Sequence, residues 1–329
     1  MPHPPFHLLP LLAFTAADQG EANSELSPPG STQSYWCQQC LLGAVNCTAA
    51  TRAQCETPAN PVADGRTYAC SFPAMVQAWR DLWRNNTGSS TELTFGWVQL
   101  NSFGHPDGPR DQAHYSPQPV RVGVDDPVGA WQPGFPSLRW AQTQSLVHVS
   151  NSFQAVVLDT PSPSGAIHSC FKQPVGARLA RGALATAYGR PEMHRSPSVS
   201  AAHRVGQRQL AVSVTGTGGS AIVVQASLGF EVLVAPATDP ARSIGGGNSA
   251  AMWHSAPISH CDGVKTLTLS LANATAHDGD EILALRYLWS STPCSGGIFS
   301  CPVYVTVPKL GALTGENDTL PLGPAMLVL

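Results

Sequence analysis

Apolar residues recur at helical spacing in three segments of roughly the first 190 residues. In the first segment they recur every three or four positions, and the run ends at Asn85-Asn86-Thr87-Gly88. Its apolar members are Phe72, Met75, Val76, Trp79, Leu82 and Trp83. A second helix is expected to begin after Pro136, and a third is expected from about Lys172 to Tyr188, with Gly189 as its stop.

Two compact apolar runs separate the expected helices. Phe95–Leu100 and Phe153–Leu158 have the length and composition of buried strands, and Asp159 ends the second run. Helix, strand, helix, strand, helix is the alternation of a parallel α/β sheet. Active residues of such sheets gather in loops beyond the carboxyl ends of the strands, so the loop after Leu158 is the first place to look for chemistry.

The pattern changes after about residue 190. Short runs rich in β-branched and apolar residues follow one another, separated by Gly, Ser, Asp and Pro, and no helical period competes with them. The runs are Leu210–Val214, Ala221–Val224, Phe230–Val234, Val264–Leu271, Glu281–Trp289 and Val303–Val307. We therefore expect an antiparallel β domain, a β-sandwich, over residues 191–310, followed by a loose tail over residues 311–329.

The start of the chain has no sustained period. Residues 18–70 are rich in Cys, Gly, Ser, Pro and Gln, and they are predicted to be a disulfide-tied loop region of an α/β unit that spans residues 18–190. Residues 1–17 contain an apolar run without a preceding Lys or Arg, which is a weak match to a secretory signal or a non-native start. No stretch has the length of a transmembrane helix, so no membrane span is expected.

Nine cysteines leave two interpretations open. The spacing of Cys37-Gln-Gln-Cys40 is half of a zinc knuckle, but no second pair follows at a matching distance. The alternative is a set of disulfides formed in an oxidising compartment, with one cysteine left over. Four N-glycosylation sequons, at Asn46, Asn85, Asn273 and Asn317, favour that alternative. We expect a secreted or lysosomal protein that holds no metal and no cofactor.

Composition narrows the function classes. Charged residues make up 12% of the 329 residues, against about 25% in an average soluble protein. The formal net charge of −3 and the lack of a basic stripe exclude nucleic acid as an expected partner. Eight tryptophans and the clear periodicities argue against intrinsic disorder.

The loop after Asp159 holds the best candidates for catalysis. His168 lies just before the third expected helix, where a histidine is well placed for general-base work because its pKa lies near operating pH. Asp159 begins the same loop and is the candidate that orients the imidazole, as the acid of a Ser-His-Asp array does. The alternative is an ordinary loop histidine beside an ordinary turn aspartate.

Six blocks in the same order over nearly 300 residues resemble the sialate O-acetylesterases, a family of SGNH-type hydrolases. The blocks are Asp18-Gln19-Gly20-Glu21-Ala22-Asn23; Cys70-Ser-Phe-Pro-Ala-Met with Trp79-Arg80; Phe95–Leu100; Phe135-Pro-Ser-Leu-Arg-Trp-Ala-Gln142; Gly165-Ala-Ile-His168 with Lys172-Gln173 and Arg178-Leu179-Ala180; and Ala284–Trp289 with Pro293-Cys294 and Cys301-Pro-Val-Tyr304. The resemblance implies a partial SGNH-type parallel-sheet domain followed by an antiparallel β-sandwich domain.

The resemblance also implies a reaction and a substrate, namely hydrolysis of an acetyl ester on sialic acid or a related sugar. His168 would be the catalytic base in that reaction. A pocket beside the oxyanion would be lined by Gln19, Gly20, Glu21 and Asn23. Arg139 and Gln142 would form a structural polar network or contact the substrate, and the structural role is favoured.

The sequence departs from the family at the nucleophile. The family's serine lies in a Gly-Gln-Ser-Asn block upstream of its Gln-Gly-Glu block, and the 18 residues before Gln19 do not form that motif. Gly165 stands where many SGNH enzymes carry an acid, so Asp159 must substitute for it. We therefore expect a form that is incomplete or inactive, through truncation or an incomplete gene model, or else through degeneration of a homologue.

Two other functions remain open. A non-catalytic glycan-binding or regulatory module on the same scaffold would use exposed tryptophans as sugar-stacking faces, and the candidates are Trp131, Trp140 and Trp253. An unrelated disulfide-rich secreted β protein is the third possibility.

Overall fold

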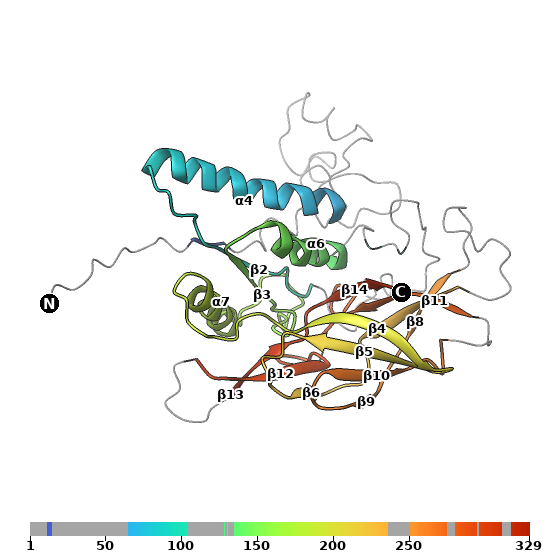
Figure 1. Ribbon diagram of the computed structural model, residues 1–329. Coiled ribbons are helices and arrows are strands. Elements are labelled where there is room, and N and C mark those ends of the chain that lie inside the picture. The colour runs from blue at the N-terminus through green and yellow to red at the C-terminus, as the bar shows by residue number, and fades with distance from the viewer. Residues whose placement is uncertain are drawn as a thin grey trace.

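A small parallel sheet with helices on both faces lies against a larger antiparallel β domain in the computed structural model of the chain (Figure 1). The structure describes residues 12–14, 65–103, 128, 130, 135–235, 251–274, 280–294, 296–310 and 317–329.

The parallel sheet has the strand order β1-β2-β3. Its strands are β1 (Leu12–Phe14), β2 (Phe95–Val98) and β3 (Ser152–Ala155). The helices are α4 (Gly65–Thr87), α6 (Phe135–His148) and α7 (Lys172–Thr186). The predicted alternation of helices and strands is confirmed from α4 to α7. β1 was not predicted as a strand.

Side chains alternate across β2 and decide which helix covers which face. Phe95 and Trp97 pack with α4 and α6 in one apolar cluster. Val98 packs with Val175 and Leu179 of α7 in another cluster. The sheet therefore has α4 and α6 on one face and α7 on the other, as Figure 1 shows.

A close approach of ring and backbone joins α7 to the sheet. The Phe153 ring lies between Gly96 of β2 and Gly182 of α7, and a Cβ added at either glycine would overlap that ring. Both glycines are needed because they leave room for the aromatic side chain, not because of an unusual φ.

The described residues of the β domain form three antiparallel sheets. One sheet has the order β4-β5-β10-β9, with β4 (Ser198–Gly206), β5 (Gln209–Thr215), β10 (Thr266–Ser270) and β9 (Ile258–Cys261). Another has the order β14-β11-β7-β8, with β14 (Ala325–Val328), β11 (Glu281–Tyr287), β7 (Phe230–Ala235) and β8 (Met252–Ser255). The third has the order β13-β12-β6, with β13 (Asn317–Pro321), β12 (Val303–Pro308) and β6 (Ile222–Val224).

Strand β7 is buried on both faces, which makes its sheet the middle layer. Phe230, Val232 and Val234 face the large core shared with β5 and β10. Leu233 faces the opposite way, into a cluster that includes Trp140 of α6. Since α6 contacts both the parallel sheet and this outer face, the two domains pack directly on each other.

The end of the run Phe153–Leu158 enters the domain interface instead of continuing as a strand. β3 ends at Ala155. Val156 and Leu158 lie in the core of the β domain, whereas Val157 faces α7. The side chains therefore keep alternating between two faces after the strand ends. One face packs on the β domain and the other packs on α7.

The prediction of a loose tail over residues 311–329 is wrong for residues 317–329, the part that the structure describes. β13 pairs with β12, and β14 pairs with β11. Leu320 and Leu322 are buried in the core of the β domain. The pattern of the sequence missed these strands because they are short, and β13 opens with the polar residues Asn317-Asp318-Thr319.

Replacing Gly182 by Ala should destabilise the protein by about 1–3 kcal/mol, because the new methyl group must displace the Phe153 ring from a filled core. Gly176→Ala is the matched control in the same helix: nothing lies within 4 Å of its added Cβ, so it should be neutral or stabilise by up to about 1 kcal/mol. Urea unfolding measures both. Equal free energies of unfolding for the two variants would contradict the packing described.

Candidate functional site

The carboxyl ends of β2 and β3 are tied together by buried polar side chains. Asn101 Nδ2 donates to the Thr160 carbonyl at 3.0 Å, and Ser102 Oγ donates to the Leu158 carbonyl at 3.0 Å. These bonds occupy carbonyl groups that a short strand leaves without ladder partners. These hydrogen bonds therefore fix the position at which the loop that begins at Asp159 leaves the sheet.

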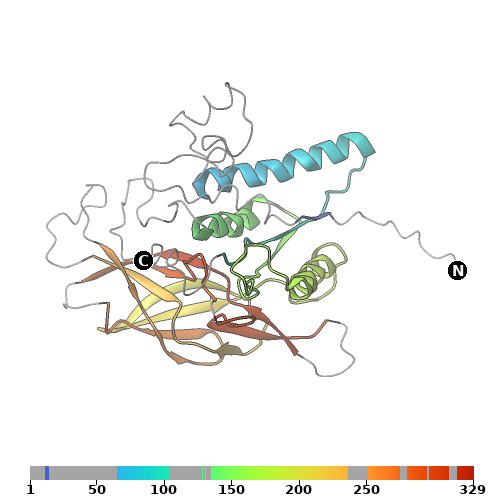
Figure 2. The ribbon, with the colours of Figure 1, turned by 180° about the vertical axis from the view of Figure 1, so that it is seen from behind.

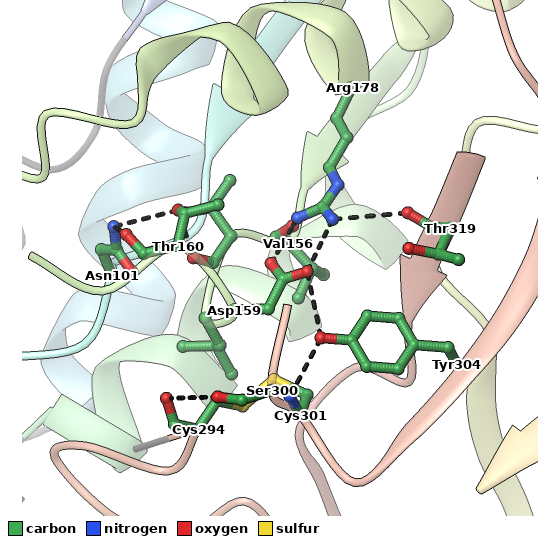
Figure 3. Close-up of polar contacts among 12 residues, drawn as sticks. Asn101, Val156, Asp159, Thr160, Arg178, Cys294, Ser300, Cys301, Tyr304 and Thr319 are labelled. Atoms are coloured by element: carbon green, nitrogen blue, oxygen red, sulfur yellow. Dashed lines mark hydrogen bonds and ion pairs between the residues drawn. A yellow bond between two sulfur atoms is a disulfide. The ribbon is translucent and has the colours of Figure 1, made fainter. Parts of the chain in front are cut away.

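Asp159 is fully buried and forms an ion pair with Arg178 of α7 (Figure 3). Nη1 and Nη2 of the arginine reach Oδ1 and Oδ2 at 2.5 and 2.7 Å, a bidentate arrangement. Nη1 also donates to the Val156 carbonyl at 2.8 Å. Burial lowers the pKa of Arg178, but the hydrogen bonds and charge of Asp159, together with Tyr304 and Asp318, raise the pKa above its ordinary value, so the arginine stays charged.

Tyr304 of β12 connects this ion pair to the β domain. Its hydroxyl donates to Asp159 Oδ2 at 3.2 Å and accepts from the Cys301 N–H at 2.9 Å. Burial, and then the negative charge of Asp159, raise the pKa of Tyr304 well above its ordinary value, so the phenol stays protonated and remains a donor. Cys301 forms a disulfide with Cys294. Asp159 thus contacts α7 and β12 at once, and Figure 2 shows α7 close to β12 and β13 from behind.

His168 lies on the same loop, between two anchored neighbours. Ile167 packs against the cluster of α4, α6 and β2, and Ser169 is buried. The Ser169 N–H donates to the Ile167 carbonyl at 3.2 Å, and Ser169 Oγ accepts from the Phe171 N–H at 3.2 Å. Since the residues on both sides are held, the exposed imidazole of His168 is presented outward just before α7.

The predicted partnership of Asp159 and His168 stays a prediction. The carboxylate oxygens of Asp159 accept from Arg178 and Tyr304, which are both buried. These contacts give Asp159 a structural role at the junction of the two domains.

Arg139 and Gln142 lie on α6, and both are fully buried. Arg139 donates to four carbonyls: those of Leu100 and Asn101 after β2, and those of Ser290 and Ser291 after β11. Gln142 Oε1 accepts from the Leu100 N–H at 2.8 Å. These contacts favour the structural interpretation of the two residues over substrate contact.

The residues predicted to line the oxyanion pocket, Gln19, Gly20, Glu21 and Asn23, lie outside the described residues, and their placement stays a prediction. The Cys37-Gln-Gln-Cys40 pair and Trp131 lie outside them as well. Within the part of the chain that the structure describes, no group of three or more His, Cys, Asp or Glu side chains is arranged to hold a metal ion.

Two of the tryptophans considered as sugar platforms pack against other side chains, Trp253 as a buried residue and Trp140 as a partly buried one. Trp253 is buried, and the Arg286 guanidinium lies 4.1 Å from the centre of its ring. Trp140 packs edge to face with Trp289, at 6.3 Å between ring centres. The rings of Trp253 and Trp140 are therefore used for packing.

Arg178 and Tyr304 were noted in the sequence only as members of motifs, and their roles were not predicted. They lie 19 and 145 positions from Asp159. Asn101 and Ser102 had one available signal, since both are polar and follow an apolar strand directly. No local sequence pattern marks the partners of a buried carboxylate when they lie this far from it in the chain.

Three of the four sequon asparagines, Asn85, Asn273 and Asn317, fall in the described residues, and all three are exposed. Exposure is what glycosylation of an acceptor asparagine requires, and their modification stays a prediction. Among the described helices, none is long and apolar enough to cross a membrane.

The fold is shared with a carbohydrate esterase of known structure. A crystal structure of a carbohydrate acetylesterase from Xanthomonas citri matches with a TM-score of 0.50 and 24% sequence identity, over 81% of this chain and 47% of that one. At this identity the match shows the fold alone.

The sequence matches confirm the resemblance to the sialate O-acetylesterases. Residues 201–313 match the family model of the sialate O-acetylesterase C-terminal domain. The sialate O-acetylesterase of Homo sapiens is 29% identical over 248 residues, or 72% of this chain, and that of Mus musculus is 28% identical over 256 residues, or 74%. The chain spans about 40% of the length of these curated relatives.

Replacing Arg178 by Met should cost about 3–5 kcal/mol of stability, because it leaves the Asp159 carboxylate buried without its cation. Tyr304→Phe removes the hydrogen bond to Asp159 and the one accepted from the Cys301 N–H, and it should cost about 1–3 kcal/mol because the buried N–H is left unpaired. Urea unfolding at neutral pH measures both losses.

The matched control is Arg84→Met, which breaks the exposed Arg84–Asp81 pair and should cost less than about 0.5 kcal/mol. If Arg178→Met cost no more than Arg84→Met, the ion pair would not be the junction described above.

Proposed function

We propose that this chain is a carboxylic ester hydrolase scaffold of the sialate O-acetylesterase type, which binds sugars that carry an O-acetyl group. O-acetylated sialic acid is the first candidate. The match of residues 201–313 to the sialate O-acetylesterase C-terminal domain carries the proposal. The similarity to curated sialate O-acetylesterases extends the support over 72% of the chain.

His168 is the proposed catalytic base of an SGNH-type reaction. Its exposed position between two anchored residues, beyond the carboxyl end of β3, suits a group that must reach substrate. In the reaction a serine Oγ attacks the acetyl carbonyl and the imidazole takes its proton. The imidazolium then protonates the departing ester oxygen, which leaves as the sugar hydroxyl, and water hydrolyses the acetyl-serine.

The oxyanion of the tetrahedral intermediate needs hydrogen-bond donors that are already in place. We assign that task to the segment of Gln19, Gly20, Glu21 and Asn23, on the resemblance of this block to the family. Asp159 is proposed to hold the loop of His168 in position, because its carboxylate binds Arg178 and Tyr304.

The 329 residues contain no Gly-Gln-Ser-Asn block. We propose that they bind an acetylated sugar but turn it over very slowly on their own, because the remaining groups only polarise and position the ester. Secretion or residence in the lysosome is proposed on the disulfide and the exposed sequons.

The test combines binding and turnover. Titration calorimetry with O-acetylated sialic acid should show saturable binding, and the non-acetylated sugar should bind more weakly because it lacks the ester. Hydrolysis of a chromogenic acetyl ester should be no faster with the wild-type chain than with His168→Ala. His260→Ala is the matched control, since His260 is an exposed histidine of the β domain.

Two outcomes would change the proposal. Turnover that disappears in His168→Ala but persists in His260→Ala would place a working nucleophile within these residues and overturn their inactivity. No binding of the acetylated sugar by a chain with a cooperative melt would overturn the proposed ligand.

A further inference from the structure

The loop closed by the Cys294–Cys301 disulfide carries exposed apolar side chains at its tip. Both cysteines are buried in the core of the β domain. Ile298 and Phe299, in contrast, are 41% and 39% exposed. Tips of short loops normally carry Gly, Asn, Asp, Pro or Ser, so two adjacent large apolar residues here are not explained by turn formation.

Phe299 also has a backbone conformation that favours glycine. Its φ is +59°, in the left-handed region, where a bulky side chain is strained. Hydrogen bonds hold it there: the Phe299 N–H donates to the Asp159 carbonyl at 2.7 Å, and Ser300 Oγ donates to the Cys294 and Gly297 carbonyls at 3.1 and 2.7 Å. Strain of this kind is concentrated at functional sites, where the surrounding structure maintains it.

The segment around the disulfide crosses the carboxyl ends of both parallel strands. After β2, the Phe103 N–H donates to the Ser291 carbonyl at 3.1 Å, and the Phe103 carbonyl accepts from Thr292 Oγ1 at 3.0 Å. After β3, the Asp159 carbonyl accepts from Phe299, and Figure 3 shows the Cys294–Cys301 disulfide beside Asp159. Ligands of open α/β sheets bind in the crevice outside these strand ends.

We propose that the loop from Cys294 to Cys301 is the wall of the substrate site that the β domain contributes, and that Phe299, with Ile298 beside it, is the apolar surface on which the ring of the acetylated sugar lies. The ring of a sugar presents C–H groups on its faces, and an aromatic side chain buries them with little loss of side-chain freedom. This inference rests on the proposed function of the chain.

In this arrangement the loop from Cys294 to Cys301 determines which sugar binds, and it takes no part in proton transfer. The disulfide and the hydrogen bonds of Ser300 and Phe299 hold the aromatic ring in place before the sugar arrives, which lowers the entropy lost on binding. His168 acts on the ester, and Phe299 selects the sugar that carries it.

The experiment measures Kd for O-acetylated sialic acid by titration calorimetry with the full chain and its Phe299 variants. Phe299→Gly should weaken binding about tenfold, the scale of one aromatic contact. The same variant should melt at an equal or higher temperature than the wild type, because glycine relieves the strain at φ +59°. Phe299→Tyr keeps the ring and should bind within about twofold of the wild type.

Val205→Ala is the matched control, because Val205 is an exposed apolar residue of the same domain, in β4. Its Kd should equal that of the wild type. If the wild type binds the acetylated sugar and Phe299→Gly has the same Kd, the loop is not a wall of the substrate site. The proposed function of the chain is not affected by that result. The proposal is also wrong if Phe299→Gly loses self-association on size exclusion while its sugar binding is unchanged. The tip of the loop would then be a contact between two copies of this chain. If the wild type binds no acetylated sugar, both proposals fail together.

Discussion

The ion pair between Arg178 and Asp159 is the interaction on which the rest of the structure depends. Both groups are buried, and a buried charge is tolerated only when it is paired and its hydrogen bonds are complete. The hydrogen bonds of the pair are complete only when α7, the end of β3 and Tyr304 of β12 lie next to one another. One electrostatic requirement therefore fixes the packing of the two domains and the starting point of the loop that carries His168.

The three helices α4, α6 and α7, which the structure describes in the α/β domain, each use a buried arginine in a comparable way. Arg80 of α4 donates to the Leu93 and Ser150 carbonyls beside the amino ends of β2 and β3. Arg139 of α6 donates to carbonyls after β2 and after β11. The described strands of this sheet have three or four residues, so many carbonyls near their ends lack ladder partners, and the five N–H donors of a guanidinium satisfy several at once. The arginines connect layers that small apolar clusters alone would join loosely.

The proposed site takes its walls from both domains. The α/β domain supplies the loop of His168, and the β domain supplies the disulfide-closed loop with Phe299. The contact of Phe299 with the Asp159 carbonyl lies next to the ion pair of the same residue. The position of the proposed sugar-binding wall and the stability of the domain junction are therefore coupled through one aspartate.

The sequence by itself determined the order of the main elements from α4 to α7 and most strands of the β domain, because helical and strand periods are local properties of the chain. Its predicted loose tail was wrong for the described residues, since β13 is short and opens with polar residues, and β14 pairs with β11, which lies well before it in the chain. Only the tertiary structure decided that Asp159 binds Arg178 and Tyr304 and that Phe299 lies at the strand ends. A buried charge or an exposed ring takes its role from neighbours that are distant in sequence, and no local pattern encodes those neighbours.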